Sequence, residues 1–522
     1  MTARTTVLSA ALALVAGAAP AFAQAPRAPA ASARVPAAVT AAANVITVDD
    51  ARARLEFLSS DFMRGRNTPS PELNIAASYL VSNYRAMGFQ PGGEGGTFYQ
   101  WYPYPLRRLD ASAARLQVTG GSGPVELAAG RDFFTAGGTT GELTGPLVYV
   151  GRAPDAAMAA GSLRGRIAVA ALPGPGNRDW RIERNRVRNA AQRAGASAVV
   201  FVLDAPWTAD SVARYATLAG RPSRTLGATV AYPQFLLTQE AAGRLFRAAG
   251  LELAQQWQAG SAASFAPVPL AGLTASAALP MQDVDQERAP NVVAILPGSD
   301  PVLRNEYVVL SAHMDHVGVG APVNGDSIYN GADDDGSGTT GILEVARAFA
   351  SMSVRPKRSI VILHVSGEEK GLLGSEWFAE HPTVPLDRIV ADINIDMIGR
   401  NNPDSVVVLG KAYSSLGATA NAVQRAHPEL HLTLADDIWP QERFFFRSDH
   451  FNFARKEVPA IFFFSGVHPD YHRPSDEVAK INFDKLTRIS RMAFFLAWDV
   501  ANTPQRPTWD PRGLQEVRGM TR

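Results

Sequence analysis

Residues 359–371 read SIVILHVSGEEKG, a buried-looking apolar segment that runs into two adjacent glutamates and a glycine. An almost continuous run of aliphatic residues predicts a strand that is covered on both faces. Residues 291–296, 307–312 and 389–396 have the same character, and residues 338–350 have helical spacing. Strands that alternate with helices predict an α/β fold, with a largely parallel mixed sheet flanked by helices.

Histidine and acidic residues follow the ends of these predicted strands. They are Glu368 and Glu369, His313 and Asp315, and Asp396. Sheets of this kind bind ligands at the carboxyl ends of their strands. Each feature also has an ordinary explanation, because a His-x-Asp pair is typical of a hydrogen-bonded loop and paired glutamates of a solvated turn. Asp396 lies among apolar residues and is expensive to bury unless it is paired or coordinated.

Residues 331–338, GADDDGSG, put three consecutive acids between glycines, directly before the predicted helix. An aspartate that caps the helix would explain one of them. It would not explain Asp333, Asp334 and Asp335 together, because three adjacent carboxylates repel one another. A bound cation is the simpler explanation.

A further histidine, His472, lies in the segment DYHRPSD at residues 470–476. Together these segments supply imidazole and carboxylate ligands, a mixture that suits zinc better than calcium or magnesium. The chain has no cysteine, so thiolate is not available. Two divalent cations, three carboxylates and one hydroxide add to a neutral cluster, which makes burial electrostatically reasonable. We therefore expect two zinc ions.

The sequence resembles the di-zinc exopeptidases that include bacterial leucyl aminopeptidases, aminopeptidase Y and glutamate carboxypeptidase II. The resemblance rests on residues 311–316, 331–338, 366–371, 394–399 and 471–472, which occur in the family's order. With its flanks it covers about residues 46–140 and 280–505. It implies the zinc exopeptidase fold.

The resemblance implies a metal-binding role for five residues. Asp333 would bridge both zinc ions, His313 and Asp396 would complete one site, and Glu369 and His472 would complete the other. A cis peptide bond between Asp333 and Asp334 is also a trait of the family.

The same resemblance implies three roles in the chemistry. Glu368 would be the general base that takes a proton from a water shared by the metals and delivers it to the leaving amine. Asp315 would hold the His313 ring by its second nitrogen. Tyr471 would steady the tetrahedral oxyanion, or it is simply a packed aromatic residue.

Removal of N-terminal amino acids from peptides is the activity that these features favour. A carboxypeptidase needs a cation for the substrate carboxylate, and Arg443 and Arg447 keep that alternative open. An amidohydrolase or a glutaminyl-cyclase-like acyl transferase is a further alternative. A non-catalytic scaffold, as in transferrin-receptor ectodomains, is disfavoured because the ligands and the base are all present.

The charge balance and the first residues bear on partners and location. Formal net charge is +1, and runs of Lys and Arg with interleaved aromatics are absent, so we expect no nucleic acid as partner. Peptide substrates are what the family resemblance implies. Residues 1–23 have the pattern of a signal peptide, with Arg4, an apolar stretch and a small-residue cleavage site. No later segment is apolar for long enough to be inserted in a membrane. We expect a secreted or periplasmic protein.

The chain divides into an Ala/Pro-rich linker at residues 24–45, a first peptidase part at 46–140, an insert at 141–265 and a catalytic part at 266–510. In the insert, residues 146–150, 166–171 and 198–202 are predicted strands, and residues 182–194 are a predicted helix. GRIAV at 165–169 and AGASAV at 194–199 resemble a protease-associated domain. The resemblance implies an inserted α/β domain.

Overall fold

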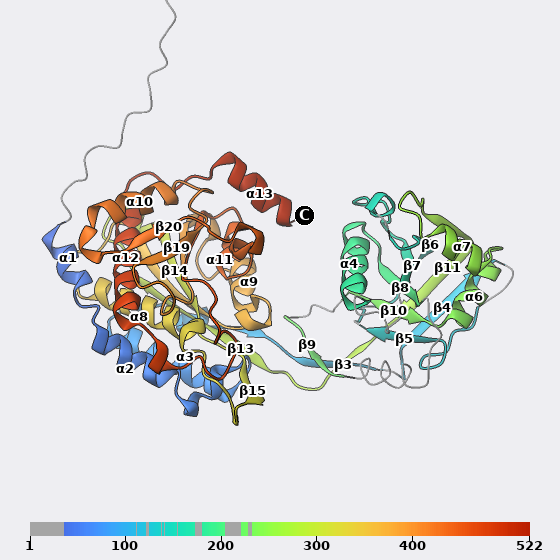
Figure 1. The fold of residues 1–522 in the computed structure, drawn as a ribbon, viewed down its shortest axis with the longest axis horizontal. Helices are drawn as coiled ribbons and strands as arrows, with labels where there is room; N and C mark the ends of the chain where they lie inside the picture. Colours follow the sequence, from blue (N-terminus) through green and yellow to red (C-terminus); the bar gives the residue numbers. More distant parts are fainter. Residues whose placement is uncertain are drawn as a thin grey trace, which may run out of the picture.

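The computed structural model describes residues 36–521, except residues 111, 122–124, 137, 140, 154, 173–179, 204–220 and 228–231. Two large sheets, each with its own apolar core, organise this part of the chain (Figure 1). A small three-stranded sheet lies between them, formed by β12 (Met281–Asp283), β3 (Leu106–Leu109) and β9 (Ser223–Arg224). The predicted signal peptide lies outside the described residues.

The larger sheet has nine strands and a parallel centre. Its order is β1 (Gln90–Pro91), β13 (Arg288–Leu296), β17 (Ser359–Val365), β14 (Tyr307–His313), β18 (Ile389–Ile395), β21 (Ala460–Phe464), β19 (Ser405–Leu409) and β20 (Thr433–Ala435), with β2 (Tyr99–Pro103) also paired to β13. Strands β17, β14, β18 and β21 run parallel, whereas β13 and β19 pair antiparallel with their neighbours. The predicted mixed α/β sheet is confirmed.

Helices cover both faces of this sheet. The main apolar core lies under α2 (Val48–Leu58), α3 (Pro71–Ala86), α8 (Gly338–Ala350), α10 (Leu416–Ala426) and α12 (Phe483–Asn502), and the opposite face carries α9 (Leu373–Glu380) and α11 (His450–Ala454). Every residue of β17 and β18 is buried, which explains why neither strand alternates in polarity.

The end of the predicted linker is a helix instead. Residues Ala37–Ala43 form α1, and Val39 and Ala43 are each only 1% exposed against the main core. The Ala-rich composition that suggested a linker also suits a helix, since alanine is the best helix former. The rest of the predicted linker, up to residue 35, lies outside the described residues.

The second sheet has seven strands and forms a unit of its own. Its order is β4 (Arg115–Gly120), β11 (Val268–Ala278), β6 (Leu143–Tyr149), β7 (Ile167–Leu172), β8 (Ala198–Leu203), β10 (Gln234–Leu237) and β5 (Phe133–Ala136). Helix α4 (Trp180–Arg193) packs on one face, and α6 (Gln239–Ala248) and α7 (Leu253–Ala259) lie with the other. The unit is therefore an α/β sandwich.

This unit is larger than the predicted insert at residues 141–265. It recruits β4 and β5 before that range and β11 after it. Strand β4 alternates buried and exposed residues, so it lacks the continuous apolar texture on which the prediction depended. The remaining elements are the hairpin β15 (Gly318–Val323) and β16 (Asp326–Tyr329), and α13 (Pro511–Thr521), which extends beyond the predicted end at 510.

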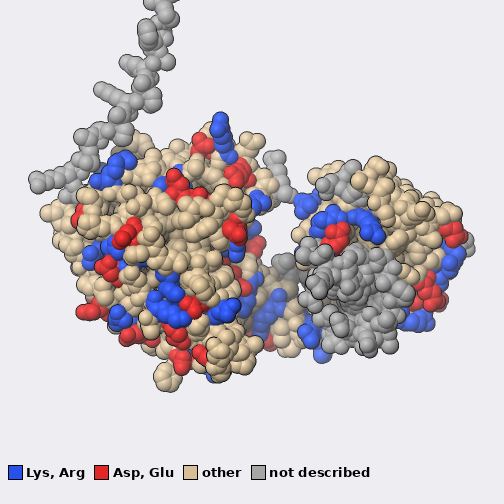
Figure 2. Space-filling view, in the orientation of Figure 1, with Lys and Arg blue, Asp and Glu red and all other residues tan. Residues whose placement is uncertain are grey.

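On the face shown in Figure 2, charged side chains of both signs are interspersed among the described residues. Among the described residues, no helix combines the length and apolarity that crossing a membrane requires.

Candidate metal centre and active site

The candidate residues meet because the central strands are parallel. His313 is the last residue of β14, Asp396 directly follows β18, and Glu369 lies in the turn after β17. His472 lies in the loop after β21. The carboxyl ends of parallel strands lie at the same edge of a sheet, and the acidic loop at residues 331–337 faces that edge just before α8.

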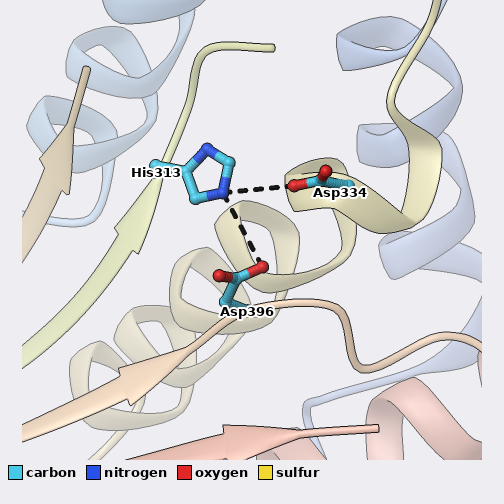
Figure 3. Close-up of side chains that lie close together, drawn as sticks. All are labelled: His313, Asp334 and Asp396. Carbon is cyan, nitrogen blue, oxygen red and sulfur yellow. Dashed lines mark ion pairs between the residues drawn. The ribbon is translucent and has the colours of Figure 1, made fainter. Parts of the chain in front are cut away.

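A first cluster joins His313, Asp334 and Asp396 (Figure 3). The His313 Nε2 atom lies 3.3 Å from Asp334 Oδ1 and 3.7 Å from Asp396 Oδ1. His313 Nε2 and Asp396 Oδ1 are buried and have no hydrogen-bond partner among the described residues. These polar atoms therefore lie close together but do not form hydrogen bonds with one another.

A second cluster shares the other oxygen of Asp334. Asp334 Oδ2 lies 3.1 Å from His472 Nε2, which is also 3.1 Å from Glu369 Oε2. On its other side, Glu369 Oε1 lies 2.8 Å from His316 Nδ1, and that nitrogen is 3.7 Å from Asp334 Oδ2. The Asp334 carboxylate thus belongs to both clusters. It lies between a first group of donors, His313 and Asp396, and a second group, Glu369, His472 and His316.

The expectation that Asp333 lies between the two groups is wrong by one residue. Asp333 Oδ1 accepts a hydrogen bond from the Gly399 backbone N–H at 2.6 Å, and Oδ2 faces His468 Nε2 at 3.3 Å. The cis peptide bond also lies one residue later than expected, between Asp334 and Asp335. The sequence contains three chemically equivalent acids, and only the path of the backbone determines which one faces both groups.

The other acids of the loop fix that path. Asp335 Oδ1 accepts from the Gly338 and Met397 N–H groups, and Oδ2 accepts from that of His313. Asp476 accepts from the N–H groups of Asp333 and Asp334. The loop is thereby joined to the ends of β14 and β18.

Gly331 is required where the loop begins. Its φ is +58°, and a Cβ atom there would lie 2.3 Å from the Asp334 carbonyl oxygen and 2.4 Å from the His316 ring. Any other residue would displace both the loop and the ring.

Neighbouring groups hold the His313 and Asp396 side chains of the first group in place. His313 Nδ1 lies 3.1 Å from the carbonyl oxygen of Asp315, and the predicted carboxylate partner is farther away, at 3.7 Å. The Asp315 carboxylate instead accepts from the Thr68 hydroxyl at 2.8 Å. Asp396 Oδ2 accepts from the Ser448 hydroxyl at 2.9 Å, which leaves its other oxygen for the first group. These contacts fix the orientation of the donors.

Two further histidines of the site, His316 and His468, were not predicted from the sequence. Both are buried, at 0% and 7% exposure, and both face carboxylates of the site. The signal for His316 was its position in the motif at residues 311–316, one residue after Asp315. Another buried histidine, His450, packs against Phe445 and Phe462.

Burial and neighbouring charges shift the pKa values of these groups. Burial acts to lower the pKa of His313, but the carboxylates of Asp396 and Glu368 outweigh it and raise that pKa well above its ordinary value. Burial raises the pKa of Glu368 well above its ordinary value, and His313 opposes that rise. The site therefore concentrates negative charge in a region with little water, which favours a cation.

A pocket adjoins the first group. Its lining includes Glu368, Asp396 and Tyr471 together with Phe444, Phe462, Phe464 and Arg447. The Tyr471 ring stacks on His472, with ring centroids 3.9 Å apart. The Arg447 guanidinium lies 4.7 Å from the centre of the Phe444 ring, and its Nη1 lies 3.5 Å from Glu442 Oε2. Phe444, Phe462 and Phe464 line the pocket and also belong to a buried apolar cluster.

Residues 291–497 match the model of peptidase family M28. That segment contains every nitrogen and oxygen donor of the two groups. The match covers less than half of the chain and shows a similarity to that family.

Over 251 residues, 28% are identical to leucine aminopeptidase 2 of Trichophyton rubrum, covering 44% of this chain and 48% of that protein. Over 248 residues, 27% are identical to leupeptin-inactivating enzyme 1 of Streptomyces exfoliatus, covering 42% and 50%. The chain spans about half the length of the curated relatives it matches. Among solved structures, an aminopeptidase from Aneurinibacillus sp. strain AM-1 is 20% identical with a TM-score of 0.47, covering 91% of this chain and 98% of that one.

Proposed function

We propose that the protein is a zinc-dependent aminopeptidase that holds two zinc ions, one at each group of donors. The observation that carries the proposal is the set of buried donor atoms without hydrogen-bond partners in the described part of the chain. They include His313 Nε2, Asp334 Oδ2, Glu369 Oε1, Asp396 Oδ1 and His472 Nε2. Leaving so many polar atoms unsatisfied is costly, and zinc, which prefers nitrogen and oxygen ligands in this mixture, would satisfy them.

In this proposal Asp334 bridges the two sites, and His313 and Asp396 complete the first. Glu369 and His472 belong to the second. Zinc bound there would polarise the scissile carbonyl and lower the pKa of a water molecule.

The chain's own residues supply the remaining steps. Glu368 lines the pocket with its side chain 14% exposed, and its Oε2 lies 4.0 Å from His313 Nε2. From there it takes the proton of the attacking water and returns it to the leaving amine. Tyr471, which lines the same pocket, would direct its hydroxyl toward the developing oxyanion.

The pocket suits an apolar side chain at the substrate's N-terminus. Phe444, Phe462 and Phe464 provide a dry aromatic wall, and Met397 adds to it. The names of similar proteins, among them leucine aminopeptidases, support the same substrate class.

Arg447 favours one second candidate, a carboxypeptidase. Its guanidinium lines the same pocket and would be available to a substrate carboxylate if the exposed Glu442 released it. Carboxypeptidases bind the free C-terminus, so they do not require a free amine.

Peptides with free and with acetylated N-termini separate the two candidates. We expect the purified protein to release leucine from Leu-Gly-Gly and to leave N-acetyl-Leu-Gly-Gly intact. Chelation should stop turnover, and added zinc should restore it. Equal cleavage of both peptides would favour the carboxypeptidase, and cleavage that survives complete removal of metal would refute the zinc proposal.

We also propose that residues 1–23 direct export to the periplasm or medium, and that the seven-stranded unit is a protease-associated domain. The small-residue pattern before Gln24 and the GRIAV and AGASAV segments support these assignments. The mass of the mature chain tests the first: cleavage after Ala23 supports it, and a retained N-terminus refutes it.

A further inference from the structure

We propose that His316 is a fourth protein ligand of the second zinc site, through its Nδ1 atom, beside Asp334, Glu369 and His472. This inference rests on the proposed function, because its ligand is the zinc ion. It adds a residue to the set that the family resemblance implied. It also makes the two sites unequal.

The distances around His316 match those between atoms that share one ion. Its Nδ1 lies 2.8 Å from Glu369 Oε1 and 3.7 Å from Asp334 Oδ2. Donors placed tetrahedrally at about 2.1 Å from zinc lie roughly 3.4 Å apart. The contacts of His472 Nε2, at 3.1 Å from the same two carboxylates, fall in the same range.

A simple hydrogen bond from His316 to Glu369 does not explain the contact. Although the two atoms are 2.8 Å apart, His316 Nδ1 and Glu369 Oε1 both lack a hydrogen-bond partner among the described residues. The ring N–H direction and the carboxylate oxygen are not aligned. His316 Nε2 is also without a partner, and the residue is 0% exposed. A fully buried imidazole with two unsatisfied nitrogens is costly, and a cation at Nδ1 removes most of that cost.

The surroundings hold the ring in this position. The His316 backbone N–H donates to the Arg66 carbonyl oxygen at 3.4 Å, and the ring lies directly against Gly331, where no Cβ fits. Its edge meets the His472 ring, with centroids 5.6 Å apart and planes at 69°. The two imidazoles thus approach the carboxylates from different directions. His316 approaches from the interior, whereas the His472 side chain is 37% exposed.

Four protein ligands would close the second site, because tetrahedral zinc is then complete. The first site, with His313, Asp334 and Asp396, has three and keeps a position open. Zinc sites with an open position are typical of catalysis, and closed sites of structure. The second zinc would therefore be held more tightly, and the substrate would bind at the first.

Metal binding tests this without relying on activity. Apo wild-type protein, His316→Ala and His316→Asn are titrated with zinc against a chromophoric chelator and, separately, with cobalt(II) followed by its visible absorption. We expect wild type to bind two zinc ions. We expect His316→Ala to weaken one of the two dissociation constants by at least about 100-fold, more than the loss of a supporting contact. The cobalt bands of that site should also change.

His316→Asn keeps a neutral donor near the Nδ1 position and should bind with intermediate affinity. His427→Asn is the matched control, since it removes a buried histidine that hydrogen-bonds Glu429 and stacks on Phe495. It should leave both constants unchanged. Thermal unfolding of each apo protein separates a folding defect from a binding defect, and if His316→Ala does not fold, His316→Asn carries the test.

Two results would overturn the inference. One is that the His316 variants keep both zinc constants within about threefold of wild type. The other is weaker binding with an unchanged cobalt spectrum, which would make His316 a residue that positions Glu369. In both cases the zinc-aminopeptidase proposal stands. That proposal fails instead if the wild-type protein itself binds no zinc.

Discussion

Replacing Arg66 with methionine should both destabilise the part of the protein built on the nine-stranded sheet and weaken metal binding. Arg66 is 1% exposed, and its guanidinium donates to the carbonyl oxygens of Met314, Leu58, Asn330 and Gly331 at 2.6–3.0 Å. Burial lowers its pKa to about 10, which still leaves it charged at neutral pH. It therefore joins the segment after β14 to the start of the acidic loop by four charge-assisted hydrogen bonds.

The magnitude follows from these contacts. A buried carbonyl that loses its partner costs about 1–3 kcal/mol, so four of them at the lower end give about 4 kcal/mol. With roughly 2 °C per kcal/mol for a large domain, the apo unit should melt about 8 °C lower. Arg66→Lys should recover part of this loss, because an ammonium can reach some of the carbonyls but lacks the planar fork.

Calorimetry of the apo proteins and zinc titration provide the assay, with Arg358→Met as the matched control. Arg358 is equally buried and donates to the Val500, Thr503 and Pro504 carbonyls, but it precedes β17, at the opposite end of the strand from the site. It should lower stability without changing zinc affinity. The reasoning is refuted if Arg66→Met shifts the melting temperature by less than about 2 °C, or if both variants change zinc affinity equally.

Three further outcomes are expected. Glu368→Gln should lower kcat by about 10²–10⁴ in steady-state kinetics while zinc content stays at the wild-type level, since only the proton carrier is lost. Tyr471→Phe should lower kcat by about 10²–10³ with little change in KM, and an unchanged kcat would make it a packed aromatic only. In the seven-stranded unit, burial opposes ionisation of Asp132, but hydrogen bonds from Arg131 and Arg244 lower its pKa to about 2. A lowered folded-state pKa stabilises above the unfolded value, so Asp132→Asn should melt lower than wild type at pH 7, and the difference should shrink as pH falls from about 4 toward 2.

The central strands of the nine-stranded sheet could be predicted well because buried parallel strands have a simple signature in the sequence, a continuous run of apolar residues. Residues 359–365 and 338–350 form β17 and α8 with the predicted bounds. The two-residue strands and the alternating edge strand β4 carry no such signature, since their pairing depends on distant partners. The second unit was therefore predicted too small.

The site was predicted by residue type but not by geometry. Strand ends place His313 and Asp396 reliably, because each follows a long buried strand directly. The choice between Asp333 and Asp334 depends on the left-handed Gly331 and the cis bond after Asp334, which composition does not reveal. His316 was missed for a related reason, because only the folded loop brings its ring against Glu369.

The most direct test compares neighbouring acids of the same loop by metal content. Purified wild type, Asp333→Asn and Asp334→Asn are measured by elemental mass spectrometry after equilibration with zinc and removal of the excess. Two zinc ions per chain are expected for wild type and for Asp333→Asn, whose amide oxygen can still accept from the Gly399 N–H. Asp334→Asn should retain at most one, since its carboxylate faces both groups of donors. Two tightly bound zinc ions in Asp334→Asn, or their loss in Asp333→Asn alone, would contradict a two-metal centre built around Asp334.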